Sequence, residues 1–69
     1  MRAKAVYRIL VRRDTVEVVD IADGETLLLW DLAPSKVRRF ARAVREDLNT
    51  MEAEDFRARW TRVQGPDDL

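Results

Sequence analysis

The sequence predicts an α+β fold, in which a three-stranded antiparallel β-meander is followed by two α-helices (βββαα). Apolar residues recur with a period of two as far as Leu32, which is typical of strands, and then with a period of 3.6, which is typical of helices. The dipeptide Asp23-Gly24 lies between two strand-like segments and is a strong hairpin signal. Because strands joined by short turns pair with their neighbours, these observations predict a meander.

Three segments have strand character because they are rich in β-branched, aromatic and other large apolar residues. They are Ala3–Arg12, Thr15–Ala22 and Glu25–Leu32. The turn between the first and second segments, Arg13-Asp14, has no glycine. A two-residue and a four-residue loop both fit it, and both leave the side chains on the same faces of the sheet.

The first predicted helix follows Leu32. Pro34 suits its first turn, and Asp31 or Ser35 is a candidate N-cap. Five residues form its apolar stripe over about four turns. They are Val37, Phe40, Ala41, Val44 and Leu48.

A second helix is predicted over Met51–Val63. Asn49 suits both the end of the first helix and the cap of the second, because Glu52 follows it at capping-box spacing. Asp55 and Arg59 are expected to pair across one turn. The apolar stripe is formed by Phe56, Val63 and Trp60, and we expect the last to lie in the core.

The chain is short and has a globular composition, with 69 residues of which 46% are hydrophobic. We expect a single domain over residues 1–63 and a flexible C-terminal tail over residues 64–69. Thirteen basic residues balance thirteen acidic ones. Arginine outnumbers lysine eleven to two, which is compatible with a GC-rich bacterial genome and with a role of some arginines at an interface.

The predicted register assigns each strand residue to one of two faces of the sheet. Apart from Asp20 and Asp31, the apolar face carries only apolar side chains: Ala5, Tyr7, Ile9, Val11, Val16, Val18, Leu27 and Leu29. The mixed face carries seven large apolar residues: Val6, Leu10, Val19, Ile21, Leu28, Trp30 and Leu32. Its polar residues are Arg8, Arg12, Thr15, Glu17 and Thr26.

We favour both helices on the apolar face or at its edge, and the alternative is that the first helix ends early and the second crosses to cover the mixed face. Reaching the other face takes the chain ~20 Å across the sheet, whereas the connector from Leu48 to Met51 spans at most ~14 Å. Leaving the mixed face in water would forgo roughly 10 kcal/mol, comparable to the whole stability of a small domain. The mixed face is therefore predicted to be buried against a second copy of the chain.

This arrangement predicts a small, non-catalytic interaction or regulatory module of a bacterium or phage, which self-associates as a homodimer. Trp30 is the candidate anchor, because tryptophan is frequent at the centre of interfaces, and the alternative is that it packs under a helix of its own chain. Leu10, Val19 and Leu28 are the other expected apolar contacts. Edge-to-edge pairing through the uncharged segment Thr26–Trp30 is the rival dimer geometry, and another protein is the other partner considered.

A charge cluster is expected on the same face. Glu17 lies diagonal to both Arg8 and Arg12 in the predicted register, which is close enough for opposite charges to pair. We expect this cluster to fix the orientation of the two copies.

The alternative prediction is nucleic-acid binding by the first helix. Five basic residues gather there: Lys36, Arg38, Arg39, Arg42 and Arg45. Arg38, Arg42 and Arg45 share a stripe opposite the apolar one, where each could contact a phosphate. The zero net charge makes this interpretation the weaker of the two.

Nothing in the sequence indicates catalysis, a cofactor or a metal site. Cysteine and histidine are absent, which removes thiolate chemistry, the commonest general base and the commonest metal ligand. Asp20, Asp23 and Glu25 surround the hairpin but do not follow the spacing of a calcium loop. No segment has the pattern of a signal peptide or a membrane span, so we expect a cytoplasmic protein without a membrane partner.

Overall fold

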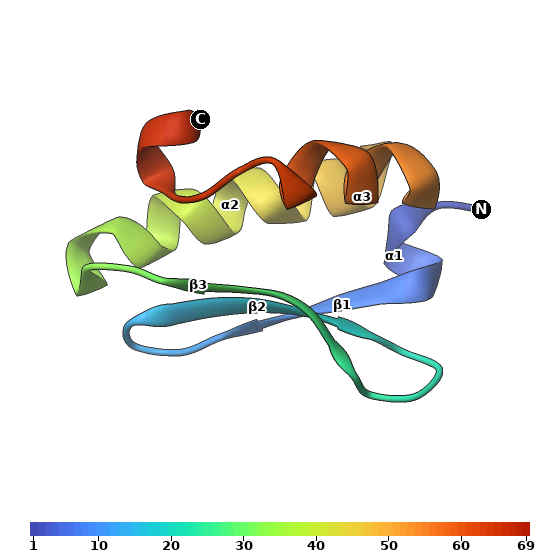
Figure 1. Cartoon of the computed structure of the whole chain (residues 1–69), viewed down its shortest axis with the longest axis horizontal. Coiled ribbons are helices and arrows are strands. Elements are labelled where there is room, and N and C mark those ends of the chain that lie inside the picture. The colour runs from blue at the N-terminus through green and yellow to red at the C-terminus, as the bar shows by residue number, and fades with distance from the viewer.

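Three antiparallel strands form a meander in the order β1-β2-β3, and the two main helices, α2 and α3, lie on the same side of it (Figure 1). The computed structural model describes all residues from 1 to 69. In chain order the elements are α1 (Ala3–Val6), β1 (Tyr7–Val11), β2 (Thr15–Asp20), β3 (Thr26–Asp31), α2 (Pro34–Thr50), α3 (Ala53–Thr61) and the 3-10 turn η1 (Pro66–Asp68). The predicted α+β fold is confirmed, with a short N-terminal helix in addition.

That helix, α1, replaces the first four residues of the predicted strand. Ala3 is fully buried, and its backbone N–H donates to the Met51 carbonyl at 3.0 Å. Ala53 N–H in turn donates to the Met1 carbonyl at 2.8 Å. These bonds hold the N-terminus against the loop between α2 and α3, so the chain turns before it enters the sheet at Tyr7. Tertiary contacts thus override the local strand preference.

Both predicted hairpins are present. Arg13-Asp14 is a two-residue loop between β1 and β2, closed by a backbone hydrogen bond of 2.9 Å. In the second hairpin the Gly24 N–H donates to the Asp20 carbonyl at 2.8 Å. Gly24 has a φ of 73°, a conformation that glycine adopts at no steric cost.

A β-bulge at Leu27 sets the faces of β3. Val18 pairs with Leu28 whereas Val19 pairs with Thr26, so Leu27 has no partner in β2. One extra residue shifts the alternation of side chains by one position. Every residue of β3 beyond the bulge therefore lies on the face opposite to the predicted one.

The predicted faces of β3 are accordingly wrong. Leu28, Trp30 and Leu32 lie on the face that the helices cover, which we call the covered face, and Trp30 is only 5% exposed. Leu29 and Asp31 lie on the opposite, open face, and Leu29 is 56% exposed. The faces predicted for β1 and β2 agree with the structure.

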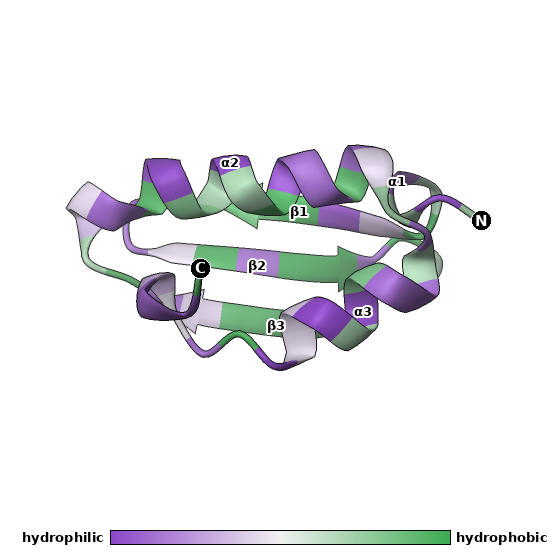
Figure 2. Cartoon of the chain, turned by 90° about the horizontal axis from the view of Figure 1, so that it is seen from above, coloured by the Kyte–Doolittle hydropathy of each residue, from purple (hydrophilic) through white to green (hydrophobic).

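The positions of the helices confirm that neither crosses to the second face of the sheet. Seen from above, α2 lies over β1 and α3 lies over β3 (Figure 2). Pro34 occupies the first turn of α2, as predicted. The N-cap is Ala33, without a side-chain hydrogen bond, so the prediction of Asp31 or Ser35 is wrong.

The start of α3 also differs from the prediction. Glu52 is its N-cap and makes no capping bond, so no capping box with Asn49 forms. The Glu52 carboxylate lies 3.1 Å from the N-terminal amine instead. Arg59 pairs with Asp47 of α2 at 3.2 Å, not with Asp55 as predicted, because α3 packs beside α2.

The core lies between the covered face and the two helices. Trp60 is fully buried, as predicted. The Trp30 ring lies edge-on to Phe40 and Trp60, with centroids 4.9 and 5.8 Å away. Both indole N–H groups are satisfied: Trp30 donates to the Val63 carbonyl at 2.8 Å, and Trp60 donates to the Asp47 carboxylate at 2.9 Å.

The last residues, 64–69, carry η1. The Gln64 N–H donates to the Asp68 carboxylate at 2.6 Å. This segment lies on the helical side of the molecule, away from the open face (Figure 1). Its predicted flexibility stays a prediction.

Candidate functional site

The open face of the sheet is the first candidate surface, because no element of the chain covers it (Figure 1). Its side chains come from alternate positions of the three strands. They are Arg8, Leu10 and the flanking Arg12 on the β1 side, Thr15, Glu17 and Val19 on β2, and Thr26, Leu29 and Asp31 on β3. The face therefore combines apolar, basic and acidic side chains.

The central row of this face runs across all three strands. Leu10 is paired with Glu17, and Glu17 is paired with Leu29. Leu10 is half-buried and Leu29 is exposed, so the carboxylate lies between two apolar side chains that water reaches. Val19, a predicted contact residue, is on this face but only 3% exposed, so it offers little area to a partner.

Glu17 is held by two donors within the chain. Arg12 donates to one carboxylate oxygen at 2.9 Å, and the Thr26 hydroxyl donates to the other. These hydrogen bonds, that of Thr26 before that of Arg12, hold the pKa of Glu17 below its usual value. The pair of Arg12 and Glu17 confirms half of the predicted cluster, whereas Arg8 lies opposite Val19 and makes no ion pair.

Two of the predicted contact residues are absent from the open face. Leu28 and Trp30 face the helices, as the bulge requires, and Leu29 and Asp31 take the positions that these residues were expected to fill. The run Leu27–Trp30 contains no polar residue that would mark the solvent side. No local sequence signal could have shown the difference.

The basic residues of α2 form a second candidate surface. All five are exposed, and none makes an ion pair: Lys36, Arg38, Arg39, Arg42 and Arg45. The paired cations lie elsewhere, at the N-terminus, on Arg12 and on Arg59. The neutral chain thus carries a concentration of unpaired positive charge on one helix. Nucleic-acid binding by these residues stays a prediction.

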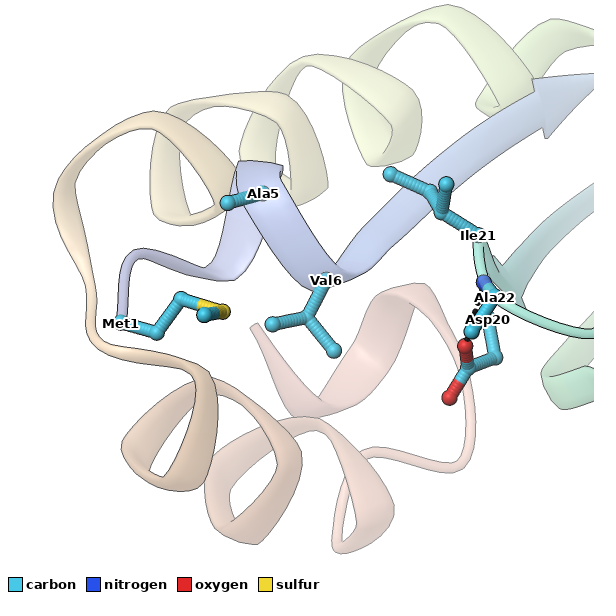
Figure 3. A pocket seen from close by; sticks show the side chains of 6 residues that line it. All are labelled: Met1, Ala5, Val6, Asp20, Ile21 and Ala22. Carbon is cyan, nitrogen blue, oxygen red and sulfur yellow. Dashed lines mark hydrogen bonds between the residues drawn. The ribbon is translucent and has the colours of Figure 1, made fainter.

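A shallow apolar pocket of about 320 Å³ lies where α1 meets the end of β2 (Figure 3). Met1 and Val6 lie on one side of it, and Ile21 and Asp20 lie on the other. It holds no cluster of polar groups that would recognise a ligand.

A smaller pocket, of about 170 Å³, lies beside the second hairpin. Two of its acidic side chains serve the turn, because Asp20 accepts from the Ala22 N–H at 2.8 Å and Asp23 accepts from the Glu25 N–H at 3.0 Å. The chain has no group of three or more His, Cys, Asp or Glu side chains arranged to hold a metal ion.

Comparison of the chain with protein-family models, with curated proteins and with solved structures finds no match. None of the helices combines the length and the apolar character that a bilayer crossing requires.

Proposed function

We propose that the chain is a non-catalytic interaction module that self-associates weakly through the open face of its sheet. The observation that carries this proposal is the central row of that face, in which Leu10 and the 56% exposed Leu29 lie on either side of Glu17. Large apolar side chains on an otherwise polar face are stabilised when a second surface removes them from water.

A two-fold axis parallel to the strands makes this face self-complementary. Such an axis places β1 over β3 of the second copy and keeps each row of residues in register. Leu10 then lies over Leu29 of the second copy, because both belong to the central row. Arg12 lies over Asp31 of the second copy, because the backbone bond between Arg12 and Thr15 places both at the level of Asp31. Aligned sheets pack in this way, at about 10 Å from one another.

Glu17 lies near the axis and faces its own copy. Two like charges would repel, but each Glu17 carboxylate already accepts hydrogen bonds from Arg12 and Thr26. The planar Arg12 guanidinium has enough donors to bridge Glu17 and Asp31 of the second copy. The neighbouring row has opposite charges at its two ends, Arg12 and Asp31, and they select this orientation over the reversed one, which would place Arg8 against Arg12.

The area of the face sets the strength of the dimer. The open face, with three strands of about six residues, measures roughly 15 by 20 Å. Its area is therefore below the ~800 Å² per partner of a stable interface. The core does not need the partner, because the helices bury Trp30 and the other large side chains of the covered face. We therefore expect a weak dimer, with a dissociation constant of about 1 µM or higher.

The test is the mass in solution, measured by sedimentation equilibrium from about 5 µM to about 1 mM. The mass should rise with concentration from 8.1 kDa towards twice that value. Leu29→Lys should keep the chain monomeric throughout, whereas the matched control Leu69→Lys, an exposed apolar residue on the helical side, should leave association unchanged.

A third variant separates the two dimer geometries. Leu10→Lys changes the open face but lies on β1, far from the free edge of β3. Loss of association in this variant supports face-to-face packing, and retention supports edge pairing through β3 instead. A wild-type chain that stays at monomer mass at 1 mM would overturn the proposal.

A further inference from the structure

We infer that the free edge of β1 is a docking site for an acidic peptide segment in extended conformation, which adds a fourth strand to the sheet. The open-face dimer does not need this edge, so the inference stands independently of the proposed self-association.

The outer edge of β1 has unpaired backbone groups. Backbone bonds from Arg12 to Thr15 and from Ile21 to Val6 show that the even-numbered residues of β1 bond to β2. In an antiparallel pair the alternate residues direct their N–H and C=O groups outward. These residues are Tyr7, Ile9 and Val11. The Tyr7 N–H donates to the Ala3 carbonyl, whereas neither Ile9 nor Val11 donates its N–H to a turn, loop or cap within the chain.

A flank of three arginines lies above this edge. Asp47 bonds to Trp60 and Arg59 of α3 and so marks the side of α2 that faces α3. Helical geometry places Arg38, Arg42 and Arg45 on the other side of the apolar stripe, which we call the outer flank of α2. Because α2 lies over β1, the outer flank lies above the free edge (Figure 2).

Positive charge also lies on the open-face side of this edge. Arg8 points to the open face from β1 and makes no ion pair. The three arginines of the outer flank make neither an ion pair nor a side-chain hydrogen bond. An added strand would therefore meet unpaired cations on both of its faces, and none of them would have to leave an internal partner.

The chemistry of the edge favours a peptide over a nucleic acid. Ile9 and Val11 each present a donor and an acceptor, and a peptide strand complements both. A phosphodiester backbone has acceptors only, so the outward carbonyls would repel it. The edge thus selects a polypeptide, and the arginines select an acidic one.

The spacing of the charges fits alternate residues of a strand. Side chains on one face of a strand recur every ~6.7 Å. Arg38, Arg42 and Arg45 are separated along the helix axis by about 6 and 4.5 Å. Acidic residues at alternate positions can therefore each reach one arginine. Symmetric pairing of two β1 strands is disfavoured at this edge, because it would bring the arginine flanks of the two copies together.

The experiment measures binding of a fluorescent peptide of alternating Glu and Val, about seven residues long, by anisotropy in the Leu29→Lys background. We expect saturable binding, about tenfold weaker when Arg38, Arg42 and Arg45 are all replaced by Gln. The control variant replaces Arg57 and Arg62, two exposed arginines of the α3 region, by Gln, and its affinity for the peptide should be unchanged. Circular dichroism checks that both variants fold.

Two further measurements separate strand addition from simple charge attraction. A peptide of the same charge with a central proline should bind at least about tenfold more weakly, because proline removes a ladder hydrogen bond. On binding of the Glu–Val peptide, the amides of Ile9 and Val11 should become protected from hydrogen exchange. Equal binding of the proline peptide, absence of this protection, or tighter binding of a DNA duplex than of the peptide would each overturn the inference.

Discussion

At the scale of single residues, Trp30 is a buried side chain of the core whose polar N–H group has a hydrogen-bond acceptor. Its ring packs against Phe40 and Trp60, and its N–H reaches the Val63 carbonyl just beyond α3. The hydrogen bond therefore ties the end of the chain to the sheet.

Replacing Trp30 with Phe should lower the free energy of unfolding by about 2 kcal/mol, since it removes both the hydrogen bond and part of the packed ring. Urea denaturation measures this. The matched control is Tyr7→Phe, which keeps the ring and removes a hydroxyl that bonds to no protein atom; its effect should stay within about 0.5 kcal/mol. Equal effects of the two changes would contradict this view of Trp30.

Two threonines of the open face are expected to affect the free energy of unfolding in opposite directions. The Thr15 hydroxyl is buried without a hydrogen-bond partner, whereas the Thr26 hydroxyl donates to Glu17. Thr15→Val should raise the free energy of unfolding by about 1 kcal/mol, because an unsatisfied buried hydroxyl is removed. Thr26→Val should lower it by about the same amount. Thermal denaturation of both variants tests the difference in sign, and a destabilised Thr15→Val variant would refute it.

Glu17 should make stability depend on pH. Its pKa is lowered in the folded state by the Thr26 and Arg12 hydrogen bonds, so the carboxylate stabilises the fold above its unfolded pKa of about 4.5. This contribution is lost as the pH falls through the lower, folded pKa. Between pH 6 and pH 3, Glu17→Gln should therefore lose less stability than the wild type, measured by urea denaturation at each pH. Glu54→Gln, which alters an exposed carboxylate of α3 that forms no ion pair, is the matched control.

At the scale of elements, the second hairpin depends on one backbone conformation. Gly24 has a φ of 73°, and no atom lies within 4 Å of the position that a Cβ would take. Gly24→Ala should therefore cost about 1 kcal/mol through backbone strain alone. Gly65→Ala is the matched control, because its surroundings are equally open and its φ of 178° is extended. Thermal unfolding that shows similar losses for both variants would rule out strain as the cause.

The periodicity of apolar residues predicts some of these elements correctly and others wrongly. The apolar stripe of α2 is long and regular, and all five of its predicted residues are buried. The N-terminal segment is different, because the alternation of Ala3 to Val6 is compatible with a strand and yet forms a helical turn. There the deciding contacts are the backbone bonds of Ala3 to Met51 and of Ala53 to Met1, which join the N-terminus to the segment between α2 and α3.

At the scale of the whole molecule, one core joins the sheet and the helices α1, α2 and α3. The sheet, α1, α2 and α3 all contribute buried side chains to a single cluster that includes Trp30 and Trp60. The helical layer and the sheet have no other core to keep them folded separately.

Unfolding should therefore be a single cooperative transition. Tryptophan fluorescence reports the cluster and far-ultraviolet circular dichroism reports the helices, and their urea midpoints should coincide. Two separate midpoints would show that the helices or the sheet persist alone, contrary to this prediction.

The sequence by itself determined the order of the three strands and the two main helices, the two hairpins and the burial of Trp60, and it favoured the placement of both helices on one side. Each of these follows from local periodicity, turn chemistry or the reach of a short connector. Only the tertiary structure decided which side chains of β3 meet the helices. The physical reason is the bulge at Leu27: one unpaired residue reverses the alternation, so Trp30 packs against Phe40 and Trp60 while Leu29 lies on the open face.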